Sequence, residues 1–334
     1  MKSPFHGSLR RQRFGALFSG AEQRRRNAHT HLVELVRDGE RITAMHSYDS
    51  PRLIEGHTRP LQPPHMIGNR MITKPNSALI VVDKVDHVAI VSLNRPAKYN
   101  ALTQAMYSDL NEVLQSADRD RNIRAVVITG VGTAFSAGND LNDFSVRDDC
   151  QAPVQRFLRT IAGIKVPVIA AVNGLAVGVG ATLLLHCDLV YADPAATFHF
   201  PFVDLGLVPE AASTLLLADF VGARRSSEIL LTGQKLTSEE AASWGLINEV
   251  STEPLDRAIA IGHTIAAKAP QAVRRTKSLT RSRLHEVTTR MTEEEAFLAL
   301  QLNSSEFAEV LTARREKRQP VFDARGANAT AEAN

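Results

Sequence analysis

Apolar and polar positions along the chain predict repeated strand and helix units between residues 88 and 192. Val88 to Leu93 and Ala125 to Thr129 are short apolar runs typical of buried strands. Between them, Leu102, Met106 and Leu110 recur at helical spacing. Further strands are expected at 168–172 and 189–192, and further helices at 156–162 and from about residue 178. This order indicates a mostly parallel α/β sheet, whose ligands usually bind at the carboxyl ends of the strands.

The pattern becomes mainly helical after residue 194. A helix is expected from Glu210 to Phe220, and Thr237 with Glu240 has the spacing of a capping box that opens another helix. A short strand is expected at 247–250. From residue 255 to about 318 the sequence reads as helix, with a cap at Asn303.

The two ends differ from the rest of the chain. Residues 1–76 are rich in Arg and Pro without sustained periodicity, and are predicted to be a disordered or targeting N-terminal extension. The arginines fit an organellar transit peptide, contact with an acidic surface, or a dispensable extension with Met71 as an alternative start. Residues 323–334 are small and polar and are predicted to be a disordered tail.

Composition indicates a globular protein with no special partner. The 334 residues are 44% hydrophobic, and the net charge of +3 arises from nearly balanced acids and bases, so no nucleic-acid partner is indicated. No apolar run approaches the roughly 18 residues that a membrane helix needs. Cys150 and Cys187 are expected to be reduced thiols in the cytoplasm, or in an organelle if the N-terminus is a transit peptide.

Common chemical motifs fit this sequence poorly. Gly174, Gly178 and Gly180 stand in an order that is wrong for a dinucleotide-binding turn. A nucleophile elbow at 134–138 lacks its leading glycine. The histidines lack metal-ligand spacing, so no metal is expected.

Two glycine-containing turns follow strands in consecutive crossovers, at 137–140 and 178–180. Adjacent parallel strands would bring these turns together, so that the N–H groups of Asn139 and Val179 converge. Two such groups can hold the oxygen of an enolate or a tetrahedral adduct. The other interpretation of each turn is a tight connection inside a buried sheet.

Taken together, these residues resemble the crotonase, or enoyl-CoA hydratase/isomerase, superfamily. The resemblance spans about residues 78–322 and rests on ordered motifs at 93–102, 135–141, 167–180, 187–189, 231–233 and 241–247. It implies a spiral of ββα units at 77–265, a C-terminal helical trimerisation region at 266–322, and assembly as a homotrimer or a dimer of trimers. It also implies an acyl-CoA substrate, no cofactor other than this CoA, and a thioester oxygen held by the Asn139 and Val179 amides.

Departures from the family pattern point to one branch. The two glutamates of the hydratases are replaced by Thr182 and Phe202. The surrounding loop is similar to that of Δ3,Δ2-enoyl-CoA isomerases of the peroxisomal type and their bacterial relatives, in which the acid/base carboxylate corresponds to Glu210. The other interpretation of Glu210 is a carboxylate that complements the dipole at a helix start.

Substrate contacts follow from the same motif positions. Lys98, Ala137, Asp140 and Leu141 are expected to contact the CoA moiety, although Lys98 is equally consistent with a solvated lysine. Phe202 is expected in the acyl pocket. Lys317 matches a lysine that reaches CoA in a neighbouring subunit of some members. The predicted activity is isomerisation of 3-enoyl-CoA to 2-enoyl-CoA. The alternatives are hydration, ring or epoxide isomerisation, thioester hydrolysis, or CoA binding without turnover.

Overall fold

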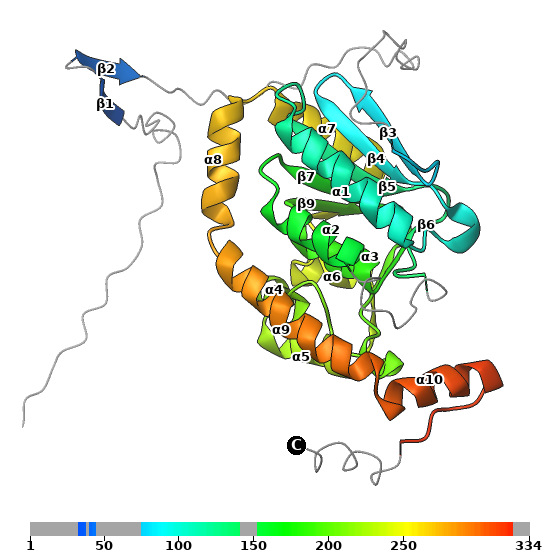
Figure 1. The fold of residues 1–334 in the computed structure, drawn as a ribbon. Coiled ribbons are helices and arrows are strands. Elements are labelled where there is room, and N and C mark those ends of the chain that lie inside the picture. The colour runs from blue at the N-terminus through cyan, green and yellow to red at the C-terminus, as the bar shows by residue number, and fades with distance from the viewer. Residues whose placement is uncertain (1–32, 38–39, 45–74, 141–151, 323–334) are drawn as a thin grey trace, which may run out of the picture. The chain divides into compact units, whose positions relative to one another are not determined.

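A computed structural model describes residues 33–37, 40–44, 75–140 and 152–322 (Figure 1). The chain divides into two compact units, Met1–Met66 and Ile67–Asn334. In the first unit, strands β1 (Val33–Arg37) and β2 (Glu40–Ala44) pair antiparallel. The sequence predicted no element in this part, and the role of residues 1–76 stays a prediction.

A six-stranded sheet forms the centre of the second unit, in the order β12-β9-β7-β5-β4-β3. Its strands are β3 (Ile80–Val85), β4 (Val88–Leu93), β5 (Ala125–Gly130), β7 (Val168–Val172), β9 (Leu189–Ala192) and β12 (Glu249–Val250). All neighbours pair parallel except β3, which pairs antiparallel with β4. The predicted strands at 88–93, 125–129, 168–172 and 189–192 are confirmed. The edge strand β3 was missed because polar Asp83 and Lys84 interrupt its apolar pattern.

A second, four-stranded sheet has the order β11-β10-β8-β6 and was not predicted. Its strands are β6 (Ala134–Ser136), β8 (Leu175–Val177), β10 (Thr197–His199) and β11 (Lys235–Thr237). Each has only three residues, too few to show a period, and β8 lies inside the segment that was interpreted as one glycine turn. Because β6, β8 and β10 follow β5, β7 and β9 and pair parallel, the expected spiral of ββα units is confirmed.

The larger sheet is buried on both faces. Alternate residues of β5 face opposite sides, so that Val126 and Ile128 join one core cluster and Val127 joins the other. Helices α1 (Gln104–Arg119) and α2 (Ala152–Gly163) cover the first face, and α7 (Pro254–Ala266) covers the second (Figure 1). On the first face, Met106, Leu110 and Leu114 of α1 are almost completely buried, as their helical spacing predicted.

The remaining helices differ in detail from the prediction. They are α3 (Val179–Thr182), the 3-10 helix η3 (Leu183–His186), α4 (Ser213–Val221), α5 (Ala223–Thr232), α6 (Ser238–Trp244), α8 (Pro270–Thr280), α9 (Leu284–Leu302) and α10 (Ser305–Glu316). The capping box of Thr237 and Glu240 is confirmed. The helical region expected from 255 to 318, with one cap at Asn303, consists of the four helices α7 to α10. Ser304, not Asn303, caps α10, because its side chain accepts a hydrogen bond from the N–H of Phe307.

The helix predicted to begin at Glu210 begins at Ser213 instead. The cause is local, because Ala211 and Ala212 have φ values of 63° and 54°, which no right-handed helix can contain. Glu210 therefore lies on a turn before the helix. Its interpretation as a residue of a helix start is wrong.

Candidate active site

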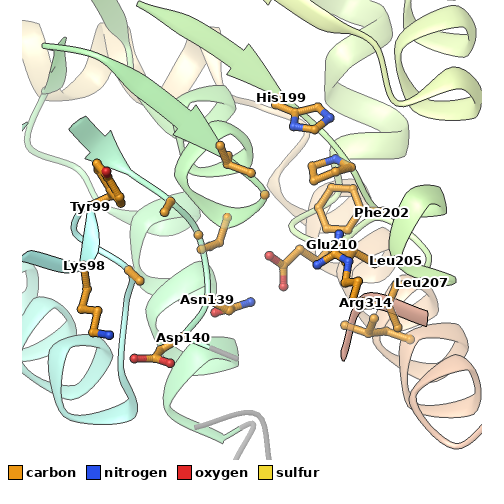
Figure 2. A pocket seen from close by; sticks show the side chains of 18 of the residues that line it. Lys98, Tyr99, Asn139, Asp140, His199, Phe202, Leu205, Leu207, Glu210 and Arg314 are labelled. Atoms are coloured by element: carbon orange, nitrogen blue, oxygen red, sulfur yellow. The ribbon is translucent and has the colours of Figure 1, made fainter. Parts of the chain in front are cut away.

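A cavity of about 620 Å³ lies where the two predicted turns meet the C-terminal helices (Figure 2). Its lining includes the turn after β6, the turn after β8, the loop from His199 to Glu210, and residues of α9 and α10. The lining residues are Ala97, Lys98, Tyr99, Ala101, Ala137, Gly138, Asn139, Asp140, Val177, Gly178, Val179, His199, Pro201, Phe202, Leu205, Leu207, Glu210, Leu298, Phe307 and Arg314. Asn139, Val179 and Glu210, predicted from separate segments, thus share one cavity.

The backbone around Asn139 is fixed by an isolated parallel bridge to Leu102. The N–H of Leu102 donates to the carbonyl of Gly138 at 2.8 Å, and the N–H of Asp140 donates to the carbonyl of Leu102 at 2.9 Å. Residues of a strand point their N–H groups alternately to opposite sides. The N–H of Asn139 consequently faces away from Leu102, on the side where β8 lies.

The Val179 amide comes from the start of α3. Val179 is the first helical residue, so its N–H has no acceptor within the helix. Gly178 precedes it with a φ of 55°, a conformation that L side chains rarely adopt. Asn139 and Val179 both line the cavity from adjacent turns, and two N–H groups directed into such a cavity would suit a negative oxygen. That they hold a thioester oxygen stays a prediction.

The two turns touch through glycines. A Cβ at Gly138 would lie 2.7 Å from the carbonyl oxygen of Val177, and a Cβ at Gly180 would lie 2.7 Å from that of Ser136. Only a residue without a side chain permits these backbone approaches. The expected convergence of the turns is therefore confirmed, although it arises from the pairing of β6 with β8 in the second sheet.

Glu210 is buried, with 6% of its surface exposed, and its carboxylate points toward Asn139 in Figure 2. Within the described part of the chain, its Oε1 atom has no hydrogen-bond partner. Desolvation, followed by the charges of Glu294 and Glu295, raises the pKa of Glu210 from 4.5 to about 7. A carboxylate with such a pKa is a stronger base than an exposed one and can exchange a proton near neutral pH.

Tyr107 of α1 is a site residue that the sequence reasoning missed. It is almost completely buried, and its hydroxyl donates a hydrogen bond to the side-chain oxygen of Asn139. Burial, and secondarily the charge of Glu210, raise the pKa of Tyr107 well above its ordinary value, so it remains a neutral donor. The sequence offers only a tyrosine on the apolar face of a helix, where most aromatic residues are simply core.

The predicted substrate-binding residues fall into three groups. Lys98, Ala137, Asp140 and Phe202 all line the cavity. Leu141 lies outside the described residues. Lys317 is not part of the cavity lining; it ends α10 in a left-handed conformation, and its proposed reach to a neighbouring subunit stays a prediction.

Two charged side chains of the cavity lining, Asp140 and Arg314, determine where charge lies around the candidate base. Asp140 forms an ion pair with Arg95 at 2.7 Å, so its carboxylate already has a cationic partner. Arg314 of α10 lines the cavity on the side of Leu205 and Leu207, across Glu210 from Lys98 (Figure 2). The cavity thus has a cation on each side of the candidate base.

The sequence resemblance implied that Thr182 and Phe202 replace two hydratase carboxylates, and of these two only Phe202 is among the residues that line the cavity. Thr182 is completely buried in α3.

Across the described residues, no group of three or more His, Cys, Asp or Glu side chains is arranged to hold a metal ion. None of the helices in the described part is both long enough and apolar enough to cross a membrane.

Known proteins are similar to this chain in both sequence and fold. A sequence model described as enoyl-CoA hydratase/isomerase matches residues 83–325. The chain is 34% identical over 247 residues to 1,2-epoxyphenylacetyl-CoA isomerase of Escherichia coli, covering 70% of this chain and 94% of that protein. It is 38% identical over 182 residues to the peroxisomal enoyl-CoA delta isomerase 3 of Mus musculus, covering 52% of this chain and 57% of that protein.

A solved structure adds the three-dimensional comparison. The crystal structure of an enoyl-CoA hydratase/isomerase from Pseudoalteromonas atlantica matches with a TM-score of 0.71 and 40% identity, over 73% of this chain and 100% of that one. Sequence motifs, the ββα spiral and these matches agree. The chain belongs to the enoyl-CoA hydratase/isomerase family.

Proposed function

We propose that this protein isomerises 3-enoyl-CoA to 2-enoyl-CoA, with Glu210 as the only acid/base group. The observation that carries the proposal is the buried Glu210 carboxylate, with a free oxygen and a pKa raised to about 7, in the same cavity as two backbone turns. The other carboxylate of the lining, Asp140, is already paired with Arg95. Moving a double bond requires one proton to leave carbon 2 and one to arrive at carbon 4, and one carboxylate can do both.

In the first half of the reaction, the Glu210 carboxylate takes a proton from carbon 2 of the bound thioester. The electron pair of that bond moves into the thioester, and its oxygen becomes an enolate oxygen. The N–H groups of Asn139 and Val179 stabilise the negative charge that develops there. Because Asn139 and Val179 hold these N–H groups in fixed backbone turns, the donors need little reorganisation as the charge develops.

In the second half, the neutral Glu210 acid returns the proton to carbon 4. The double bond then lies between carbons 2 and 3, the thioester carbonyl is restored, and Glu210 is again a carboxylate. No atom or electron is gained or lost overall. The reaction as proposed therefore needs no oxidant, reductant or metal, and CoA takes part only as the carrier of the substrate.

Hydration of 2-enoyl-CoA is a poorer fit to the same cavity. Adding water needs an acid and a base placed over one water molecule. Thr182 and Phe202 stand at the positions of the two hydratase carboxylates and can act as neither. An epoxide isomerisation has more support, because 1,2-epoxyphenylacetyl-CoA isomerase is among the relatives of this chain.

CoA binding is proposed to occur on the Lys98 side of the cavity. Lys98 is exposed at the end of a short 3-10 helix, Pro96–Lys98, where its ammonium can meet a phosphate group. Ala137 offers a small surface beside it, and its own N–H is already bound to the carbonyl of Tyr99. The acyl chain would then extend past Glu210 toward Phe202 and α10.

Assembly into a trimer or a dimer of trimers is proposed from the surface of the C-terminal helices. Leu279 of α8 and Phe297 and Leu300 of α9 are each more than 60% exposed, at 76%, 62% and 67%. Large exposed apolar side chains of this kind lose contact with water when another protein surface covers them, which supports the proposed assembly. Light scattering of the purified protein is expected to give the mass of three or six chains, and the mass of one chain would contradict the assembly.

A substrate panel tests the function. The purified protein is offered a 3-enoyl-CoA, a 2-enoyl-CoA and an epoxyacyl-CoA, and products are separated by chromatography. Rapid conversion of the first substrate alone supports the proposal. Hydration of the second, or turnover of only the third, assigns another family chemistry. Tight binding of all three without product would identify a CoA-binding module.

A further inference from the structure

The turn that carries Glu210 has an unusual backbone. Ala211 and Ala212 follow Glu210 with φ values of 63° and 54°, and neither is a glycine. A left-handed conformation is unfavourable for residues with a Cβ and persists only where surrounding contacts hold it. Such strain next to a candidate base raises the question of what holds the turn.

Glu294 of α9 makes the main contacts to this turn. Its Oε2 accepts the N–H of Ala212 at 2.5 Å, and its Oε1 accepts both the N–H and the hydroxyl of Thr214, at 3.0 and 2.6 Å. Glu294 is itself 5% exposed. Both oxygens are therefore occupied as acceptors by a segment 80 or more residues earlier in the chain.

These contacts replace the cap that α4 lacks. Ala212 is the N-cap residue of α4 and has no side chain that can accept a hydrogen bond. The carboxylate of Glu294 instead satisfies the free N–H groups at the helix start, where negative charge is favourable. A carboxylate on a distant helix thus fixes the point at which the helix begins and, with it, the turn that precedes it.

Two further contacts hold the arrangement from either side. His186 of η3 lies with Nε2 2.8 Å from the carbonyl of Ala211. Burial lowers the pKa of His186 to about 4, so it stays neutral and Nε2 carries the donated proton. Helix α9 is tied to α2 by a bidentate ion pair of Arg159 with Glu295, at 2.7 and 2.8 Å.

We propose that Glu294 is a positioning residue for Glu210. By holding the turn from Ala211 to Thr214, it directs the Glu210 carboxylate into the cavity with one oxygen free to accept a proton. This inference rests on the proposed role of Glu210 as the base. According to this proposal, helix α9 of the C-terminal helical region positions the candidate base, a role that is separate from assembly.

Charge supplies a second effect of the same residue. Burial raises the pKa of Glu294 to about 6, and above that pH it is an anion beside Glu210. Of the charges that raise the pKa of Glu210, Glu294 ranks before Glu295, which is already paired with Arg159. Further ionisable groups near the two carboxylates are Tyr107 of α1, Arg290 of α9, His186 of η3 and, in the cavity lining, Lys98, Asp140, His199 and Arg314. Removing the charge of Glu294 is therefore expected to lower the pKa of Glu210.

The test compares Glu294→Gln and Glu294→Ala with Glu286→Gln as the matched control. Glu286 is exposed on the same helix and forms an ion pair with Arg283. Glu294→Ala is expected to lower kcat about 10²-fold with little change in KM, because the base is misplaced while the thioester side is intact. Glu294→Gln keeps the size and one acceptor oxygen, so its loss of kcat is expected to be smaller. Glu286→Gln is expected to behave as wild type.

A titration that needs no substrate separates this inference from the proposed function. The carboxyl band of Glu210, assigned by its loss in Glu210→Gln, is followed by infrared difference spectroscopy over pH. In Glu294→Gln it is expected to titrate at lower pH than in wild type. An unchanged titration together with an unchanged kcat overturns the role of Glu294, and the glutamine variant decides if the alanine variant does not fold. A wild-type protein inactive on 3-enoyl-CoA overturns the proposed function but leaves this titration as a test.

Discussion

The two sides of the cavity are built in different ways. On the oxyanion side, Asn139 and Val179 offer backbone N–H groups from turns that follow β6 and β8, and glycines allow those turns to touch. On the base side, Glu210 offers a side chain from a left-handed turn held by Glu294 and His186. The first side is fixed by sheet pairing between neighbouring units, whereas the second depends on contacts from a C-terminal helix.

This difference has a consequence for how each side responds to substitution. Backbone amides cannot be exchanged by substitution, so the oxyanion side suits any reaction that passes through a thioester enolate. The base side consists of side chains, which substitutions can change while the backbone turns remain. The type of reaction is therefore decided on the base side.

The largest expected effect is on the base side. Glu210→Gln keeps the shape of the side chain but cannot take a proton, and it is expected to lower kcat by about 10³-fold with little change in KM. Steady-state kinetics with 3-enoyl-CoA measures this. Asp204→Asn, on the same loop but outside the cavity lining, serves as the control. A glutamine variant that retained most of its activity would move the base elsewhere.

The next largest loss of kcat is expected when the backbone turns of the oxyanion side are displaced. A Cβ at Gly180 would lie 2.7 Å from the carbonyl of Ser136, so Gly180→Ala must push the two turns apart. Displacing one donor of this kind is expected to lower kcat about 10²-fold or more. Gly163→Ala is the control, since Gly163, like Gly180, has no positive φ, and a Cβ there would meet only the Leu284 side chain at 3.9 Å. It reports the effect of adding a methyl group without a clash, and equal kinetics in the two variants would count against a built oxyanion site.

Glu210→Gln is expected to change stability in the direction opposite to its effect on activity. The pKa of Glu210 is raised from 4.5 in the unfolded chain to about 7 in the fold, so the folded protein prefers the neutral acid and loses stability as pH rises through about 7. This shift corresponds to about 3 kcal/mol at most. Glu210→Gln removes the penalty and is expected to raise the free energy of unfolding above pH 7 but not below pH 4.5. Denaturant unfolding at both pH values checks this, and a pH-independent difference would contradict it.

The smallest expected loss of kcat comes from removing the hydrogen bond between Tyr107 and the Asn139 side chain. Tyr107→Phe removes the hydroxyl that donates to Asn139 but keeps the ring that packs on Phe157, 5.6 Å between centroids. Losing one hydrogen bond is expected to lower kcat by about fivefold, or about 1 kcal/mol. Ser108→Ala, which removes a hydroxyl bonded to the carbonyl of Gln104 on the same helix, is the control. Equal effects of both changes would make Tyr107 only a core residue.

Sequence patterns predicted the parts of the fold that repeat. The larger sheet was foreseen because β4, β5, β7 and β9 are continuous apolar runs, and α1 because its apolar positions recur at helical spacing. The second sheet was not, since strands of three residues carry no period. Ala211 and Ala212 gave no warning of a left-handed turn, because alanine is usually a good helix former.

The site was predicted only where a motif contains the functional residue. Asn139, Val179 and Glu210 stand at motif positions, and the structure places all three around one cavity. Tyr107 and Glu294 were missed because they act through contacts with residues 32 and 82 positions away in the chain. Such contacts are created by the fold, and no local pattern in the sequence encodes them.

The central claim is that one carboxylate moves a proton between carbons 2 and 4 of an enoyl thioester. The most direct test follows a 3-enoyl-CoA by proton NMR in D₂O with wild-type protein and with Glu210→Gln. Wild-type protein is expected to shift the double bond to carbon 2 and to exchange the carbon 2 proton, while the variant does neither at a comparable rate. Exchange and isomerisation that persist in Glu210→Gln would contradict the account.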